Sequence, residues 1–160
     1  RSSDLEHQRL YGVEGELDTE ATPASPWKAI VRRSGTDISL IAYGGSMHKA
    51  LEAAEALEKD GVSAEVVDLR SLRPLDRATI IESFSRTHRA VVIDEAWKTG
   101  SLASEVSAIL AEEAFYELDA PIARVCTVEV PIPYAKHLED AALPQVDEIV
   151  AAAKRSVGSG

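Results

Sequence analysis

The sequence has little that would build a disulfide framework, a membrane span or a basic surface. Its 160 residues include one cysteine, Cys126, so no disulfide can form within the chain, and we expect a reducing compartment. Lysine and arginine number 17 against 27 aspartates and glutamates, a net charge of −10. This balance argues against nucleic acid and against anionic membrane surfaces as partners. No apolar run approaches the roughly 20 residues of a membrane span.

The remaining composition is that of a globular protein. Apolar residues make up 45% of the chain and charged residues 28%, and the length is that of one domain. Residues 1–25 are interpreted as an irregular entry and linker, with a short strand at 5–10 and an irregular connection from 11 to 25. Residues 26–156 form the predicted domain, and 157–160 a flexible tail.

Short apolar segments alternate with amphipathic segments from residue 27 onward. The first helix begins with Ser46 as its cap and closes at Gly61, and the second is capped by Asp76. A third spans 101–116, and a closing helix carries Val146 and Ile149. The strands are predicted at 27–32, 37–43, 62–69, 89–94 and 121–128, of which 37–43 is apolar on both faces. This alternation predicts an α/β fold with a mostly parallel sheet between two helical layers.

The loop after the strand at 37–43 carries candidate chemistry. Gly44, Gly45 and Ser46 join a strand to a helix N-terminus, where free N–H groups can bind an anion. We favour a tight turn capped by Ser46 and keep a docked anion as the alternative. A hydrolase that uses Ser46 and His48 is a third and weaker hypothesis, because residues two apart on a helix diverge.

Charged residues also follow the other strands. Asp94 and Glu95 end a strand at the edge where open α/β sheets bind ligands, but adjacent residues on a strand point to opposite faces. We favour a corner in which one acid caps the next helix. Arg70 and Arg73 could clamp a carboxylate or phosphate. We favour an ion-pair network, with Asp68, Asp76 or a neighbouring subunit as the partner of these arginines.

The other reactive side chains form no pattern. The four histidines lack the spacing of metal ligands, and Cys126 lies in an apolar strand, where it is expected to be inert. Tyr134 follows a stiff, proline-rich segment and is a candidate for an exposed contact residue. The residues alone therefore predict no catalytic, cofactor-binding or metal site, and they favour a binding or assembly role.

Five loop motifs are together similar to one enzyme family. They lie in order at residues 66–76, 94–100, 118–121, 131–135 and 143–144. The chain resembles, over residues 5–156, the C-terminal, transketolase-type domain of the beta subunit of pyruvate dehydrogenase-type 2-oxo acid dehydrogenases. The resemblance implies a three-layer α/β/α domain with a five-stranded mixed sheet, in which the strand at 27–32 is antiparallel. It also implies that residues 1–25 are the end of a preceding domain and a linker.

The resemblance also implies a reaction and a set of partners. Such enzymes use thiamine diphosphate and Mg to decarboxylate a 2-oxo acid, and they acylate the lipoyl arm of an acyltransferase. The cofactor lies between the alpha subunit and the N-terminal domain of the beta subunit, so no cofactor is expected on this chain, which alone would be inactive. Pyruvate is the first candidate substrate, ahead of branched-chain 2-oxo acids and acetoin.

The implied role of this domain is assembly. Its partners would be the alpha subunit, a second beta subunit in a heterotetramer, and the basic subunit-binding domain of the acyltransferase, which an acidic chain would attract. The candidate partner-binding residues are Asp119, Arg70, Arg73, Trp97 and Tyr134, with the helix at 146–157 as a further surface. The expected location is the cytoplasm in bacteria, and the mitochondrial matrix or a plastid in eukaryotes. The alternative is a standalone module that holds an anion or regulator at Gly44, Gly45 and Ser46.

Overall fold

The computed structural model describes residues 7–14, 25 and 27–158. The short strand predicted at 5–10 is wrong where it can be checked, because Gln8–Gly12 form a 3₁₀ helix, η1. Residues 5 and 6, most of the predicted linker and the last two residues lie outside the described part of the chain.

A five-stranded mixed sheet forms the centre of the domain, as predicted. The strand order is β1-β3-β2-β4-β5, and β1 is antiparallel to β3 while every other pairing is parallel. All five residues of β2 are buried, because helices cover both faces of this central strand. The strands are β1 (Ile30–Arg33), β2 (Ile38–Ala42), β3 (Ala64–Asp68), β4 (Ala90–Trp97) and β5 (Ala123–Thr127).

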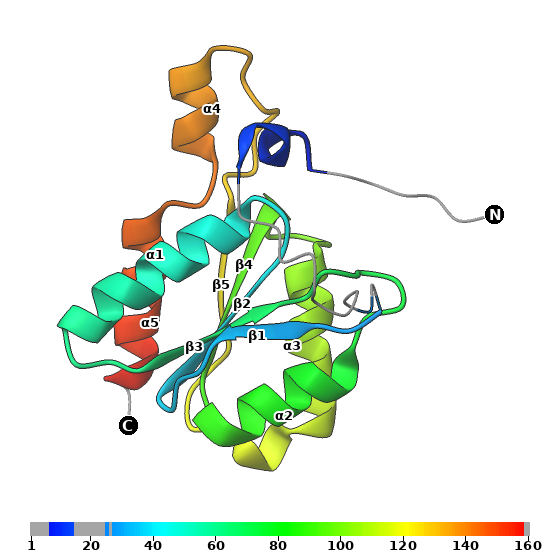
Figure 1. Cartoon of the computed structure of the whole chain (residues 1–160), viewed down its shortest axis with the longest axis vertical. Helices are drawn as coiled ribbons and strands as arrows, with labels where there is room; N and C mark the ends of the chain where they lie inside the picture. The colour runs from blue at the N-terminus through cyan, green and yellow to red at the C-terminus, as the bar shows by residue number, and fades with distance from the viewer. Residues whose placement is uncertain (1–6, 15–24, 26, 159–160) are drawn as a thin grey trace.

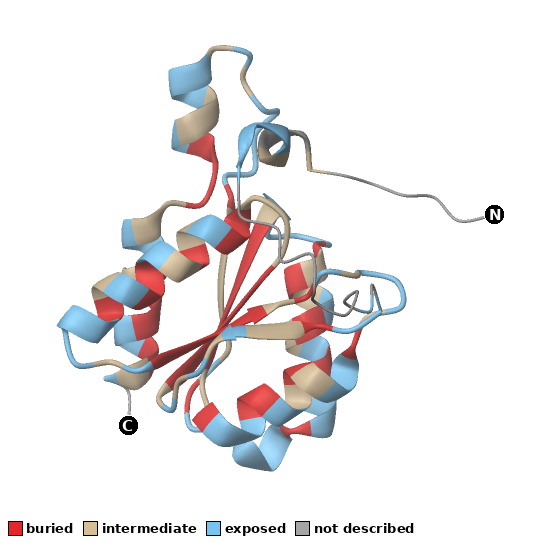
Figure 2. Cartoon of the chain, viewed as in Figure 1, coloured by how far each residue is buried: buried red, intermediate tan, exposed pale blue. Residues whose placement is uncertain are grey.

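Two pairs of helices cover the sheet. α1 (Ser46–Lys59) and α5 (Val146–Val157) pack on one face, and α2 (Arg77–Thr87) and α3 (Leu102–Glu113) on the other (Figure 1). Each pair closes its own apolar core, seen as the buried residues that flank the sheet in Figure 2. Val157, predicted to begin a flexible tail, is the last residue of α5 and packs against the first core.

The helix ends show which local predictions succeed. Asp76 caps α2, because its carboxylate accepts hydrogen bonds from the Thr79 N–H and hydroxyl groups. Gly61 follows α1 with a φ of +79°, the left-handed conformation that glycine adopts without strain. The helix predicted at 101–116 ends earlier, and a 3₁₀ turn, η2 (Phe115–Glu117), follows it.

A short helix that the sequence did not predict projects from the domain. α4 (Lys136–Ala142) and the loop before it extend beyond the sheet (Figure 1), and of the residues in α4 only Ala142 is buried. Within the described residues, no helix is long and apolar enough to cross a membrane.

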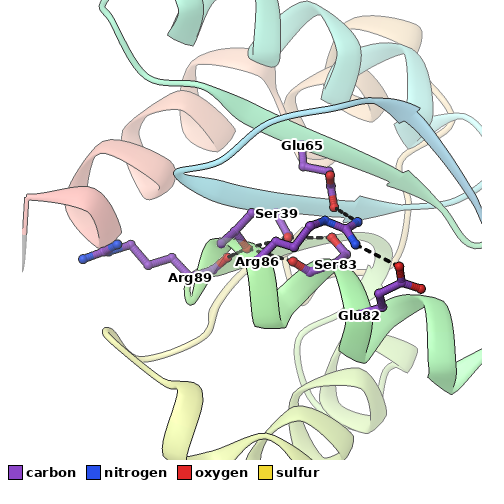
Figure 3. Close-up of polar contacts among 7 residues, drawn as sticks. Ser39, Glu65, Glu82, Ser83, Arg86 and Arg89 are labelled. Atoms are coloured by element: carbon purple, nitrogen blue, oxygen red, sulfur yellow. Dashed lines mark hydrogen bonds and ion pairs between the residues drawn. The ribbon is translucent and has the colours of Figure 1, made fainter.

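Polar side chains cluster beneath α2 near the amino ends of the parallel strands (Figure 3). The Ser39 hydroxyl lies 2.7 Å from that of Ser83. The buried carboxylate of Glu65 accepts a 2.7 Å hydrogen bond from Arg86, which also pairs with Glu82. These contacts satisfy polar groups in the sheet interior. The loops at the opposite, carboxyl edge carry the candidate functional residues.

Candidate functional site at the carboxyl edge of the sheet

The helices that follow the two central strands, β2 and β4, lie on opposite faces of the sheet. After β2 the chain passes through α1 on one face, and after β4 it passes through α3 on the other face. In open α/β sheets such a reversal leaves a crevice between the two strand ends, where ligands bind. The crevice here lies between the turn after β2 and the end of β4.

Asp94 organises one side of this crevice. Its buried carboxylate accepts hydrogen bonds from the Tyr43 hydroxyl at 2.7 Å and from the Ala96 and Ala103 N–H groups, each at 2.9 Å. Ala103 lies in the first turn of α3, so the prediction that an acid from this strand caps the next helix is confirmed. Burial, followed by the hydrogen bond and negative charge of Asp94, raises the pKa of Tyr43 well above its usual range.

Glu95 points to the other side of the strand, as expected for adjacent strand residues. Its Oε2 atom lies 2.7 Å from Nε2 of His7, and its Oε1 atom accepts a 3.4 Å hydrogen bond from the Ser46 hydroxyl. The prediction that Ser46 caps α1 is therefore wrong. Gly45 is the N-cap, and Ser46 donates to Glu95 instead of accepting from the helix backbone.

The side chain of His7 fills the crevice. A Cβ atom built on Gly45 would lie 2.6 Å from Cε1 of His7 and 3.0 Å from Oε1 of Glu95. A Cβ atom on Gly44 would lie 3.0 Å from Cδ2 of His7. All three distances are below an ordinary van der Waals contact, so a side chain at either position would crowd the imidazole in this place.

This packing decides between the hypotheses for the turn. The chain's own Glu95 carboxylate stands beside Ser46 at the helix N-terminus, where an external anion would have docked. Repulsion by that carboxylate disfavours the standalone anion-binding module. Ser46 is buried and bonded to Glu95, while His48 is exposed and makes no described hydrogen bond to Ser46. The structure therefore contradicts a serine–histidine hydrolase pair.

The same geometry bears on the cofactor that the family resemblance implies. A diphosphate requires an electropositive cradle, and the crevice presents a carboxylate. Among the described residues, no three histidine, cysteine, aspartate or glutamate side chains are grouped so as to hold a metal ion. The crevice beside Glu95 therefore does not favour a bound diphosphate, and the absence of the cofactor from this domain stays a prediction.

An open cavity of about 560 Å³ adjoins the crevice. It lies between η1, α1 and the ends of β1 and β3, and its lining includes Leu10, Arg32, Asp68 and Arg70. Burial raises the pKa of Asp68 although the hydrogen bond from the Arg70 N–H group and two nearby arginines oppose the shift. The cavity therefore combines an apolar floor with mixed charge.

The predicted ion-pair network within the loop after β3 is not present. Asp68 accepts a hydrogen bond from the backbone N–H of Arg70, and Asp76 accepts from the Ala29 N–H and pairs with Lys28. Both acids are thus bonded to groups other than the two guanidinium groups. In the described part of the chain, neither Arg70 nor Arg73 forms a side-chain ion pair, and an intersubunit partner stays a prediction.

The five candidate partner residues divide between two ends of the domain. Arg70, Arg73, Trp97 and Tyr134 follow or end strands at the carboxyl edge. Tyr134 is fully exposed there, and Trp97 is 46% exposed. Asp119 lies at the opposite edge, just before β5. Its half-exposed carboxylate pairs with Arg89 at 3.2 Å, and its N–H donates to the His88 carbonyl.

Cys126 lies on β5 and packs against the second core, in agreement with a structural role. Burial and the nearby charge of Asp94 raise the pKa of its thiol, which lowers its reactivity. His7 is the functional residue that the sequence did not reveal. It lies 88 positions from Glu95, and no spacing rule links residues so far apart.

Comparison with known protein families decides the family. The model of the transketolase C-terminal domain matches residues 27–149. The chain belongs to this family. Its fold, with four parallel strands and one antiparallel edge strand, agrees with the predicted three-layer domain.

Similar proteins include beta subunits of two enzymes. The chain is 43% identical over 155 residues to the beta subunit of acetoin:2,6-dichlorophenolindophenol oxidoreductase from Cupriavidus necator, covering 97% of this chain and 46% of that protein. It is 44% identical over 156 residues to the mitochondrial pyruvate dehydrogenase E1 component subunit beta-2 of Oryza sativa, covering 95% and 42%. The chain therefore spans less than half the length of these relatives.

A solved structure supports the same conclusion. A split-gene transketolase, described as an inactive beta4 tetramer, superposes with a TM-score of 0.75 at 31% identity, over 90% of this chain and 46% of that one. The predicted fold and the predicted resemblance to dehydrogenase beta subunits are confirmed.

Proposed function

We propose that this chain acts as the C-terminal assembly domain of the beta subunit of a thiamine diphosphate-dependent 2-oxo acid dehydrogenase. The observation that carries the proposal is the 44% identity to a pyruvate dehydrogenase beta subunit across nearly the whole chain. In the complete enzyme, the decarboxylation and the transfer of the acyl group to a lipoyl arm would be performed by groups outside this domain.

The carboxyl edge supports an assembly role because it holds apolar side chains that the domain leaves uncovered. We call this set the rim: Trp97, Val128, Val130, Ile132, Tyr134 and Leu138, all at least 40% exposed. Hydrogen bonds also order the loops that carry the rim. Trp97 Nε1 donates to the Val130 carbonyl at 3.1 Å, and Thr99 donates twice to Glu129, so two loops are tied together. A pre-ordered apolar surface is typical of an interface.

The partners proposed for the rim are the alpha subunit and a second beta subunit. Arg70 and Arg73, which lack an ion pair within the described chain, would meet acidic groups of those subunits. Support for a beta–beta contact comes from the similar transketolase chain, whose structure is described as a beta4 tetramer.

The end of the domain that carries Asp119 is proposed to dock the basic subunit-binding domain of the acyltransferase. Asp119 stands here with Glu117, and the exposed rings of Phe115 and Tyr116 stack edge to face beside them. The separation of this end from the rim would allow the acyltransferase to bind without displacing another subunit.

The cofactors of the complete enzyme would be thiamine diphosphate and Mg, held by the alpha subunit and the preceding part of the beta subunit. Pyruvate is the first substrate to test, with acetoin and branched-chain 2-oxo acids next. The similarity to the acetoin and pyruvate enzymes is nearly equal and does not choose between them. The proposed location is the cytoplasm of a bacterium, or the mitochondrial matrix or a plastid of a eukaryote.

Reconstitution tests the proposed activity. The full-length native polypeptide would be co-expressed with its alpha subunit, and dye reduction would be measured with pyruvate, acetoin or 2-oxoisovalerate in the presence of thiamine diphosphate and Mg. We expect a heterotetramer whose activity requires both subunits, and no activity from the 160-residue chain. Failure of the complete pair to turn over any of the three substrates would overturn the proposal.

The Asp119→Lys variant tests the acyltransferase surface. We expect its complex with the subunit-binding domain to be about tenfold weaker at low salt, with a smaller difference at high salt, because exposed charges are screened. Glu55→Lys is the matched control, since Glu55 is an exposed acid on α1, on the other face of the sheet. Equal affinities of the two variants, measured by calorimetry, would remove Asp119 from this surface.

A further inference from the structure

The N-terminal segment around His7 lies across the carboxyl edge of the sheet. His7 inserts between the turn after β2 and the end of β4, and its Nε2 atom lies 2.7 Å from the Glu95 carboxylate. The two side chains are only 26% and 21% exposed, so this contact is sheltered from solvent. A hydrogen bond in such surroundings is stronger than one at the surface.

The residues after His7 form the 3₁₀ helix η1. Leu10 lines the cavity between η1 and α1, whereas Tyr11, Gly12, Val13 and Glu14 are exposed. The backbone turns on itself after His7, because the Leu10 N–H donates to the His7 carbonyl and the Val13 N–H to the Leu10 carbonyl. The inserted imidazole therefore links this turn to the end of β4.

The opposing surface is shaped for the imidazole. Gly45 has helical dihedral angles that alanine adopts equally well, with φ −63° and ψ −28°. Glycine at this position is thus explained by the close approach of His7 and not by the backbone conformation. Glu95 is in turn held by the Ser46 hydroxyl, and its carbonyl accepts a 2.8 Å hydrogen bond from Thr127 of β5.

We propose that the His7–Glu95 pair, seated on Gly44 and Gly45, is a latch that docks the chain's own N-terminal segment in the crevice. The occupant of this ligand-type crevice is then residues 7–13, and no diffusible ligand binds there while the latch is closed. In a dehydrogenase beta subunit the latch would hold the junction with the preceding part of the polypeptide. That last statement rests on the proposed function, whereas the latch itself does not.

Amide hydrogen exchange on this 160-residue chain tests the latch. In Gly45→Ala the new methyl group collides with the imidazole, and we expect the Leu10 and Val13 amides to exchange about tenfold faster or more than in the unmodified chain. His7→Ala should give the same acceleration without any change in α1. Gly12→Ala is the matched control, because a Cβ atom there meets nothing within 4 Å.

Two results would overturn the latch. One is unchanged exchange at Leu10 and Val13 in both Gly45→Ala and His7→Ala. The other is equal acceleration in Gly12→Ala, which would show that any change in this region loosens the segment. Exchange at the core amides of β2 and β4 reports whether each variant is folded. Because the measurement needs no partner, cofactor or activity, its failure is distinct from failure of the reconstitution.

Discussion

Replacement of Asp94 by alanine tests how the end of β4 is held. The Ala103 N–H would lose a charged acceptor in a buried position, a loss of about 1.5–3 kcal/mol. The half-buried Tyr43 hydroxyl and the Ala96 N–H would lose about 1 kcal/mol each. Relief from burying a carboxylate offsets about 1–2 kcal/mol of this. We therefore expect Asp94→Ala to lower the free energy of unfolding by about 1.5–4 kcal/mol.

Urea denaturation, followed by circular dichroism, measures this loss. Asp94→Asn keeps one acceptor oxygen and should lose about half as much, so it remains informative if the alanine variant does not fold. Asp60→Ala is the control, because Asp60 forms a half-exposed ion pair with Lys154 whose removal should cost less than about 1 kcal/mol.

The ionisation of Tyr43 provides a second readout of the same contact. Asp94→Asn removes a negative charge beside the Tyr43 hydroxyl, so the pKa of Tyr43 should fall. Absorbance at alkaline pH follows this ionisation. A loss below about 1 kcal/mol in Asp94→Ala, with no change in Tyr43 titration for Asp94→Asn, would refute the assignment of Asp94 as the cap of α3.

Two further predictions concern buried acids. Burial alone would raise the pKa of Asp76, but hydrogen bonds from Thr79 and the Ala29 N–H, with the charge of Lys28, together lower it. The difference in free energy of unfolding between the unmodified chain and Asp76→Asn should thus be constant above about pH 5. It should become smaller as the pH falls below about 4, where the carboxylate is protonated. A difference that does not depend on pH would contradict this. Arg86→Met removes the partner of the buried Glu65 (Figure 3), and urea denaturation should show that the free energy of unfolding falls by about 1–3 kcal/mol. The exposed control Glu82→Gln should lower it by less than about 1 kcal/mol. Equal losses in these two variants would contradict the role of Arg86.

Predictions from the sequence succeeded where the pattern that determines a feature lies within one helix or strand and its flanking residues. The apolar run at 37–43 predicted a strand buried on both faces, and β2 is that strand. Asp76 precedes its helix and caps it, and the strand alternation placed Asp94 and Glu95 on opposite faces. Each of these features depends on residues a few positions apart, so the local pattern determines it.

Predictions failed where a distant segment competes for the same group. Ser46 has the residue type of a cap, but it donates to Glu95, which β4 brings to the helix end. Asp76 was expected to pair with an arginine of its own loop, but it accepts a hydrogen bond from the distant Ala29 N–H and pairs with Lys28. In each case a contact formed on folding replaced the one available within the segment.

The sequence by itself determined the α/β class, the number of strands with their approximate positions in the chain, and the family, because periodic burial and loop motifs are local properties of the chain. The tertiary structure alone decided which side chains meet at the carboxyl ends of the parallel strands and which stay exposed there. It packed His7 against Gly45 and Glu95, left the rim uncovered, and placed Asp119 at the opposite edge. These relations join residues far apart in the chain, and only the crossing of α1 and α3 to opposite faces of the sheet brings them to their positions.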